Sequence, residues 1–112
     1  MVEDRLMRWH DRFEWDDRKA EANLRKHGVT FDQAAEVLMD DHADRFHLEE
    51  YDDEHSDDED RFITTASHPA NRDVVLVISW TQRRDRSGHV TRIIGVRRAT
   101  PAERKRYESE IA

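Results

Sequence analysis

Residues 61–96 read RFITTASHPANRDVVLVISWTQRRDRSGHVTRIIGV, and this stretch decides the fold. Three segments in it are rich in β-branched and aromatic residues, which favour strands: residues 61–66, 74–81 and 90–96. Turn-forming residues separate them, namely Pro69 and Asn71 in the first interval and Ser87-Gly88 in the second. Short connections of this kind join neighbouring antiparallel strands, so the stretch predicts an antiparallel meander.

Two helices are predicted upstream of the meander. Residues 17–27 have apolar residues at helical spacing, with Asp16 as the expected N-cap and Gly28 as the left-handed stop. A second helix follows directly, because Thr30 and Gln33 have the spacing of a capping box.

Shorter elements complete the pattern. Alternating residues predict a short strand at 12–15 and another at 45–51, which runs into an acidic stretch at 52–60 that we interpret as a solvated loop. Thr100-Pro101 followed by Glu103 predicts a last helix, running to about residue 110.

This order of elements predicts a single compact α+β domain. We expect an antiparallel sheet of about four to five strands, packed with two N-terminal helices and one C-terminal helix. The domain should span residues 1–112, with residues 1–11 as a flexible N-terminal segment, because 112 residues suffice for one core and not for two.

Composition narrows the class of protein. The chain has no cysteine, which excludes a disulfide framework and a thiolate metal site, and no apolar run approaches the length of a membrane span. We therefore expect a protein of the reducing cytoplasm that does not contact a membrane.

Charge is divided unevenly along the chain, although the net charge is -7. Residues 36–60 hold thirteen acids and one base, whereas residues 72–107 hold ten bases and three acids. The basic half could bind an anionic polymer. The acidic segment, residues 40–60, either faces a basic partner or keeps the chain in solution.

Several chemistries are disfavoured. The three glycines do not form a phosphate-binding loop, and there is no Gly-x-Ser-x-Gly motif, which argues against nucleotide hydrolysis and serine esterase activity. The spacing of His42 and His47 fits no common zinc signature. We expect no metal and no cofactor.

Arginines in the basic half are candidates for binding phosphodiesters through paired hydrogen bonds. Those on the last two strands and their turn are Arg83, Arg84, Arg86, Arg92, Arg97 and Arg98. In a regular strand Arg92 and Arg97 would project to opposite faces, so they can share a site only if a bulge intervenes. An aromatic ring such as Trp80 or Tyr107 could stack on a base. The alternative is an ordinary solubilising surface.

Histidines and a lysine are candidates for proton transfer or charge stabilisation. Lys26 and His27 end the first predicted helix, where a cation also interacts favourably with the helix dipole. His55 is a second candidate, with the alternative of a solvated loop histidine among acids.

The chain resembles the BrnT toxin family over residues 13–107. The opening signature is carried by Phe13-Glu14-Trp15-Asp16-Asp17, Lys19, Asn23, Lys26-His27-Gly28-Val29, Phe31 and Ala34. Asp53-Glu54-His55-Ser56, Glu59 and Arg61-Phe62 resemble its middle motif, Arg92-Ile93-Ile94, Arg97 and Ala99 its last strand, and Arg104 and Tyr107 its C-terminal helix.

The resemblance implies a RelE-like, microbial-ribonuclease-like fold that cleaves RNA and blocks translation. It further implies a BrnA-type ribbon-helix-helix antitoxin, which we expect in a 2:2 complex and which would make the DNA contacts. We expect metal-independent attack of the RNA 2'-hydroxyl on the adjacent phosphate. The expected catalytic residues are Lys26, His27, Arg61, Arg83 and Arg97, the expected RNA contacts are Lys19, Trp80, Arg92, Arg98 and Tyr107, and His55 is a further proton-transfer candidate.

The chain departs from the family pattern at Gln82. The family usually has glutamate in this tripeptide, here Thr81-Gln82-Arg83, and glutamine cannot act as a general base. Gly95 stands where the family has serine, and residues 83–89 are longer and more basic than expected. The alternative function is therefore a weakened or inactive module that mainly binds its antitoxin. A DNA-binding regulator acting alone would have to use the helix at 17–27, whose bases Arg18, Lys19, Arg25 and Lys26 share the helix with the acids Asp17 and Glu21.

Overall fold

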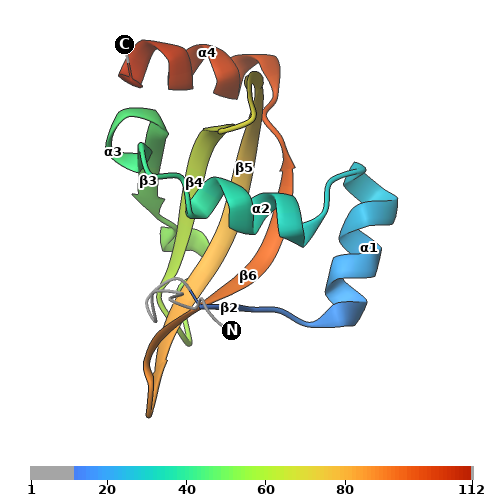
Figure 1. The fold of residues 1–112 in the computed structure, drawn as a ribbon, viewed down its shortest axis with the longest axis vertical. Coiled ribbons are helices and arrows are strands. Elements are labelled where there is room, and N and C mark those ends of the chain that lie inside the picture. The colour runs from blue at the N-terminus through green and yellow to red at the C-terminus, as the bar shows by residue number, and fades with distance from the viewer. Residues whose placement is uncertain (1–11, 112) are drawn as a thin grey trace.

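A five-stranded sheet forms the centre of the structure, a computed structural model that describes residues 12–111 (Figure 1). The strand order is β2-β6-β5-β4-β3. The strands are β2 (Phe13–Glu14), β3 (His47–Tyr51), β4 (Arg61–His68), β5 (Asn71–Asp85) and β6 (Gly88–Arg98). The predicted meander is confirmed, since β4, β5 and β6 pair antiparallel in sequence order and β3 adds to β4.

Strand β2 runs parallel to β6, so the sheet is mixed. Phe13 lies opposite Thr91, and Glu14 lies opposite Arg92. The expectation of an antiparallel sheet therefore holds for the other four strands and is wrong for β2. Alternation along a short segment indicates which residues face the core and contains no information on the direction of pairing.

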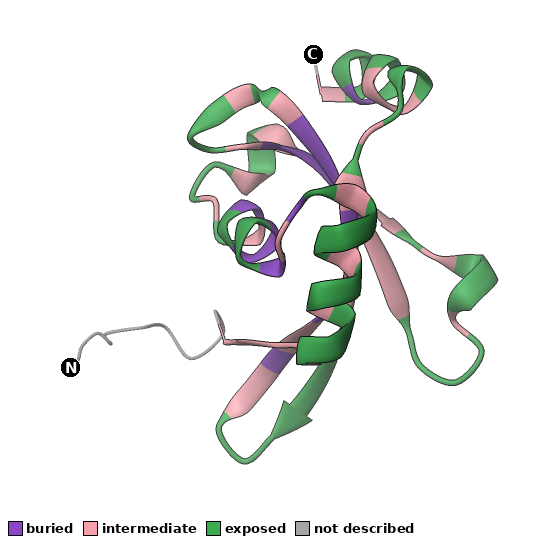
Figure 2. Cartoon of the chain, turned by 90° about the vertical axis from the view of Figure 1, so that its right-hand side faces the viewer, coloured by how far each residue is buried: buried purple, intermediate pink, exposed green. Residues whose placement is uncertain are grey.

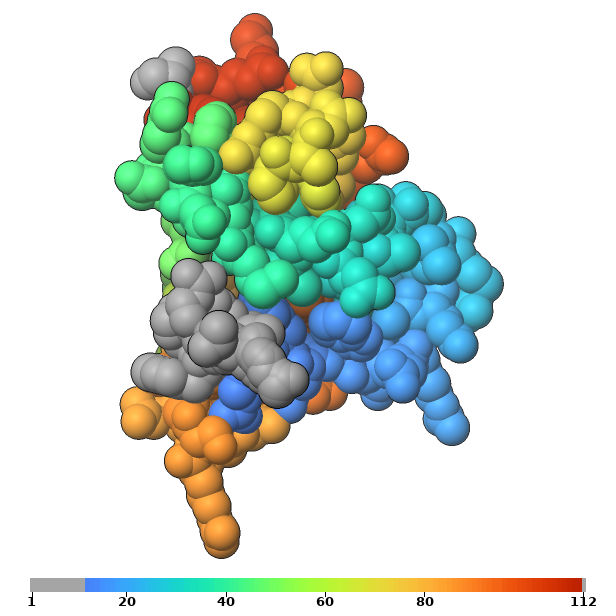
Figure 3. All heavy atoms as spheres, in the orientation of Figure 1, coloured from blue at the N-terminus to red at the C-terminus, as the bar shows by residue number. Residues whose placement is uncertain are grey.

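Strands β5 and β6 are longer than predicted. They continue to Asp85 and from Gly88, joined by a tight turn, so residues 83–89 extend the hairpin instead of forming a loop. The prediction ended both strands where β-branched residues give way to arginine. We call residues 83–89, the end of the β5–β6 hairpin, the ribbon. Both faces of the ribbon are exposed, so it accepts long charged side chains, and Figure 3 shows its tip projecting from the rest of the molecule.

The three long helices begin and end as their caps predict. Helix α1 (Asp17–His27) ends at Gly28, which is left-handed with a φ of 71°, and α2 (Phe31–Leu38) begins with the complete capping box of Thr30. Helix α4 (Pro101–Ile111) is the predicted C-terminal helix. Two short elements were not predicted: helix α3 (Ala43–Phe46) and the 3-10 helix η2 (Asp53–His55), which lies inside the expected acidic loop.

The core lies between α2 and one face of the sheet (Figure 1). Phe31 and Val37 of α2 pack in one cluster with Ile78, Ile93 and Val96 of the strands. Figure 2 shows the buried residues gathered in α2 and the sheet, while α1 is exposed along most of its length beside β6.

The opposite face of the sheet, which we call the cleft face, includes Arg61, Ile63, Ser79 and Gly95. These residues alternate with the buried ones and pair across the strands, Ile63 with Ser79 and Ser79 with Gly95. Helix α4 covers one end of this face, where Tyr107 is buried. Beside it, the described residues leave a cleft on the same face.

Two further expectations concern the N-terminal segment and the membrane. The expectation for residues 1–11 lies outside the described residues. No helix among residues 12–111 is long and apolar enough to cross a membrane.

Candidate active site

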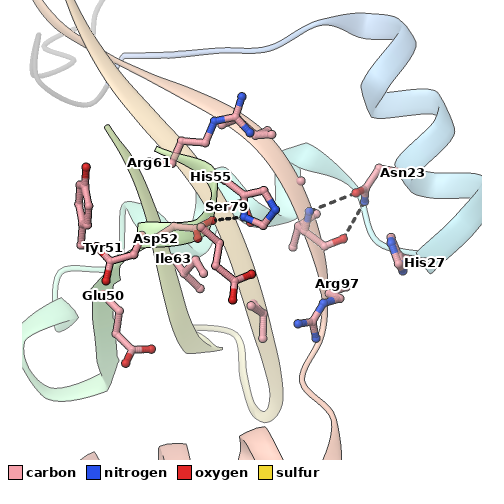
Figure 4. A pocket seen from close by; sticks show the side chains of 16 residues that line it. Asn23, His27, Glu50, Tyr51, Asp52, His55, Arg61, Ile63, Ser79 and Arg97 are labelled. Atoms are coloured by element: carbon pink, nitrogen blue, oxygen red, sulfur yellow. Dashed lines mark hydrogen bonds and ion pairs between the residues drawn. The ribbon is translucent and has the colours of Figure 1, made fainter. Parts of the chain in front are cut away.

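A cleft of about 650 Å³ opens on the cleft face, between the end of α1 and the segment that follows β3 (Figure 4). Its floor consists of strands β4, β5 and β6. Polar lining residues include Asn23, His27, Glu50, Asp52, His55, Arg61, Ser79 and Arg97. The cleft therefore collects two arginines and two histidines that the sequence singled out.

A β-bulge places Arg92 and Arg97 on the same side of the sheet. Ser79 pairs with Gly95 but Trp80 pairs with Ile93, so Ile94 is an extra residue in β6. As a result Arg92 lies opposite Thr81 and Arg97 lies opposite Val77, and both β5 partners belong to the cleft face. The condition set by the sequence, that a bulge must intervene, is met.

Arg61 begins β4 at the rim of the cleft. Its Nε donates to Oε2 of Glu59 at 3.3 Å, and about a third of its side chain is exposed. It lies opposite Thr81, whose hydroxyl donates to the backbone oxygen of Asp60 at 2.6 Å and holds the start of the strand. Among the described residues this is the one hydrogen bond of the guanidinium, so its two terminal nitrogens can bind an anion.

Arg97 is held by Glu103 of α4. Two parallel hydrogen bonds of 2.7 and 2.8 Å join the guanidinium to the carboxylate. These bonds lower the pKa of Glu103 to about 2 and raise that of Arg97. A phosphate that binds Arg97 has to share this guanidinium with Glu103 or displace it, because both anions use the same bidentate geometry.

Arg83 and Arg92 share Glu14 of β2 and lie outside the cleft. Arg83 makes hydrogen bonds of 2.8 and 2.5 Å to the carboxylate, and Arg92 makes one of 3.0 Å. The bonds from Arg83 and then Arg92 lower the pKa of Glu14 to about 2. The structure thus places Arg83 and Arg92 on the cleft face but toward the ribbon.

His27 reaches the cleft because Asn23 fixes α1 to the edge of β6. The Asn23 amide donates to the backbone oxygens of Val96 and Val29 at 2.8 and 3.0 Å, and accepts from the Val96 N–H at 3.1 Å. The side chain therefore satisfies the backbone of β6 much as a neighbouring strand would. Figure 4 shows the two hydrogen bonds from Asn23 to β6, and His27 on the same helix, one turn further.

His55 enters from η2 and is paired with Asp52. Its Nδ1 lies 2.9 Å from Oδ2 of Asp52. The segment is closed onto β4, because the Asp52 N–H donates to the Arg61 oxygen at 2.8 Å and the Ser56 hydroxyl accepts from the Arg61 N–H at 3.0 Å. Asp52 is therefore held in place by backbone contacts that do not involve its carboxylate.

Glu50 adds a carboxylate to the same wall of the cleft. Arg106 of α4 donates to it, with one bond of 3.1 Å, and lowers its pKa. The Glu50 carboxylate is thus partly neutralised by Arg106 of α4, and the Asp52 carboxylate is hydrogen-bonded to His55.

Several predicted contacts are not brought to the cleft. Trp80 faces α2, stacked on Phe62 at 4.8 Å with its Nε1 donating to Thr64. Lys19 and Lys26 are exposed on α1, and Arg98 is exposed at the end of β6. None of these four side chains lines the cleft.

Tyr107 is buried, so its prediction as an RNA contact is wrong. The side chain is 2% exposed, and its hydroxyl accepts from the Ser67 N–H at 3.1 Å and donates to the Phe46 oxygen at 2.6 Å. A base cannot stack on a buried ring, so we leave Tyr107 out of the site.

Gln82 also lies away from the cleft. It is exposed and pairs with Thr91, one position from Thr81, so it projects on the side of the sheet opposite Arg61. The loss of a carboxylate at this position therefore leaves the cleft unchanged.

Sequence reasoning missed the roles of Asp52, Glu103 and Asn23. Asn23 was visible as part of the opening signature, and Glu103 as a capping residue. Asp52 stands in a run of acids in which no spacing distinguishes it from its neighbours.

Comparison with protein families decides the class of protein. A family model described as "Ribonuclease toxin, BrnT, of type II toxin-antitoxin system" matches residues 15–103. The chain belongs to the BrnT toxin family. Among curated proteins, none matches the chain.

Membership of the BrnT family supplies the general function. These proteins are ribonuclease toxins of type II toxin-antitoxin systems, which implies an RNA substrate and an antitoxin partner. The matched range contains Asn23, His27, Asp52, Arg61 and Arg97, so the cleft belongs to the part that is BrnT-like.

Proposed function

We propose that this chain is an active toxin that cleaves RNA in the cleft without a metal ion. The observation that carries the proposal is the convergence of Arg61 and Arg97 with His27 and His55 around one cavity (Figure 4). The four side chains come from β4, β6, α1 and η2, so only the folded chain assembles them. Two cations to hold a phosphate and two imidazoles to move protons suffice for phosphodiester cleavage.

The reaction needs no nucleophile from outside the substrate. One imidazole takes the proton of the 2'-hydroxyl, and this oxygen attacks the adjacent phosphorus. The bond from phosphorus to the 5'-oxygen breaks, and the leaving oxygen takes a proton from the other imidazole. The products are a 2',3'-cyclic phosphate and a 5'-hydroxyl, and Arg61 and Arg97 stabilise the charge on the phosphoryl oxygens in the transition state.

The surroundings of the two histidines favour different roles in proton transfer. His27 is the last residue of α1, where the helix dipole favours a cation. His55 has a carboxylate at its Nδ1, which favours acceptance of a proton at the other nitrogen. We therefore assign the general base to His55 and the general acid to His27.

The remaining expected residues act outside the reacting centre. Arg83 and Arg92 lie on the same face toward the ribbon, where they would contact the RNA strand as it leaves the cleft. Lys19, Lys26 and Arg98 are exposed and would contribute to the electrostatic attraction of the strand.

The partner we propose is a ribbon-helix-helix antitoxin in a 2:2 complex. DNA binding would then belong to the antitoxin. On α1 the exposed bases Arg18, Lys19, Arg25 and Lys26 share the helix with the exposed acids Asp17 and Glu21, which would repel the phosphates of a DNA groove.

A second candidate function is an inactive module that only binds its antitoxin. The pairing of Arg97 with Glu103 favours it, because a guanidinium engaged at two hydrogen bonds binds a phosphate less readily.

Expression of the chain alone in a bacterial host separates the two. The proposal predicts growth arrest and loss of total-RNA integrity, abolished by Arg61→Ala and retained in Arg18→Ala, a matched control because Arg18 is exposed on α1 outside the cleft. Normal growth and intact RNA with folded protein in the cells would support the inactive module. Toxicity that appears only in Gln82→Glu would place the activity on the other face of the sheet and overturn the proposed site.

A further inference from the structure

Asp52 and His55 form a pair whose exposures differ sharply. The Asp52 side chain is 12% exposed, whereas that of His55 is 63% exposed. The carboxylate thus lies in the protein surface, and the imidazole extends from it into the cleft (Figure 4). A pair formed merely for solubility would leave both partners in solvent.

The hydrogen bond between them determines the tautomer. An ionised carboxylate has no proton to donate, so at 2.9 Å the Nδ1 of His55 has to be the donor. A neutral imidazole that donates from Nδ1 has its lone pair on Nε2. Because Nδ1 is occupied by Asp52, Nε2 is the nitrogen left for the cleft.

The position of Asp52 is independent of its carboxylate. The Asp52 N–H donates to the Arg61 oxygen at 2.8 Å, and its own oxygen accepts from the Ser56 hydroxyl at 2.5 Å. The same segment thus orients the histidine and fixes the start of β4, which carries Arg61. Removal of the Asp52 carboxylate leaves these backbone bonds intact.

We propose that Asp52 is a positioning residue, which holds the His55 ring with Nδ1 protonated and with Nε2 free to take the proton of the RNA 2'-hydroxyl. This inference rests on the proposed function, in which His55 is the general base. Asp52 does not touch the substrate. It sets the tautomer and stabilises the imidazolium that forms when Nε2 accepts the proton.

Other charged groups lie around the ring and make a matched control possible. Those that line the cleft or the adjoining hollow with His55 are His27, Glu50, Asp53, Glu54, Asp57, Asp58, Glu59, Arg61 and Arg97. Asp53 is the best control, because Asp53→Asn removes the same charge from the next residue of the same segment. Asp53 is exposed and also lines the cleft.

The first test measures the tautomer directly. In the ¹⁵N and ¹³C NMR spectra of the full chain, at a pH where the ring is neutral, His55 is expected as the Nδ1–H form in the wild type and in Asp53→Asn. In Asp52→Asn and Asp52→Ala a substantial Nε2–H population is expected. A wild-type ring that is mainly Nε2–H, or a tautomer ratio unchanged by both Asp52 variants, would overturn the proposal.

The second test is kinetic. Asp52→Asn is expected to lower kcat for RNA cleavage by about 10- to 100-fold with KM unchanged, which is less than the roughly 10²- to 10⁴-fold that proton transfer as a whole contributes, because the His55 base itself is still present. Adding Asp52→Asn to His55→Gln should cause no further loss, because the two residues act as one unit. A full additive loss, or a change confined to KM, would contradict the positioning role. If the wild type cleaves no RNA the proposed function fails, and the tautomer measurement still decides the role of Asp52.

Discussion

Arg92 and Arg97 project from the same face of the sheet, although an odd number of positions in β6 separates them. The extra residue Ile94 restores their common direction, since Thr81 and Val77 are their partners on β5. The bulge thereby brings Arg92, which Glu14 holds together with Arg83, to the face that carries Arg97 and Arg61. An RNA strand laid along this face would meet Arg61 and Arg97 at the cleft and Arg92 beyond it.

Glu103→Gln should strengthen RNA binding. The change removes the charge that competes for Arg97, while glutamine keeps the capping contact at Thr100. We expect several-fold tighter binding of a non-cleavable 2'-deoxy oligonucleotide. The stability loss should stay below about 1 kcal/mol, because the pair is roughly 40% exposed and screened by water. Glu108→Gln, which unpairs Arg104 elsewhere on α4, is the control; equal affinities in all three proteins would contradict the competition.

Acid should remove the stabilisation that Glu14 provides. The pKa of this carboxyl is lowered to about 2 in the folded chain from 4.5, so the stabilisation is fully present above about pH 4.5 and is lost as the pH falls toward about 2. Denaturant unfolding of the wild type and Glu14→Gln should show a gap in unfolding free energy that closes across this window. A constant gap at every pH would mean that Glu14 does not act through its charge.

Tyr107→Phe tests the structural assignment of the buried ring. The variant leaves the Ser67 N–H and the Phe46 oxygen without their partner, so we expect a loss of about 1–3 kcal/mol in the free energy of unfolding. RNA affinity of the folded variant should equal that of the wild type. Weaker RNA binding at undiminished stability would return Tyr107 to the site.

Asn23→Ala should release α1 from β6. Its amide is the partner of both the N–H and the oxygen of Val96, so the Val96 amide proton should exchange faster with solvent. RNA cleavage should fall more in Asn23→Ala than in the control Arg25→Ala, which changes an exposed residue of the same helix. The reason is that α1 also carries His27, whose position in the cleft depends on the attachment of the helix to β6. Unchanged exchange at Val96 would show that other contacts hold α1.

Caps and β-branched segments predicted most of the fold. Gly28 and Thr30 delimit α1 and α2 as expected, because these signals are local and each has one structural solution. The parallel pairing of β2 and the ends of β5 and β6 were not predictable, since they depend on which strand lies alongside.

The candidate site was predictable in composition and not in arrangement. His27, His55, Arg61 and Arg97 were named from the sequence, and the cleft includes all four. Their meeting depends on the attachment of α1 to β6 through Asn23 and on the closure of Asp52 onto β4, neither of which has a sequence signal. Trp80 was misplaced because alternation does not tell which face of a sheet remains open.

Metal-independent cleavage through the 2'-hydroxyl can be tested on the purified chain in the presence of a strong chelator. The chain is incubated with an RNA oligonucleotide and with its 2'-O-methyl counterpart, and the products are identified by mass spectrometry. We expect the RNA to be cut to 2',3'-cyclic phosphate and 5'-hydroxyl ends, the 2'-O-methyl strand to stay intact, and Arg61→Ala to lower the rate by about 100-fold or more. Cleavage of the 2'-O-methyl strand, products with 5'-phosphate ends, or activity that vanishes with the chelator and returns with a metal ion would contradict this mechanism.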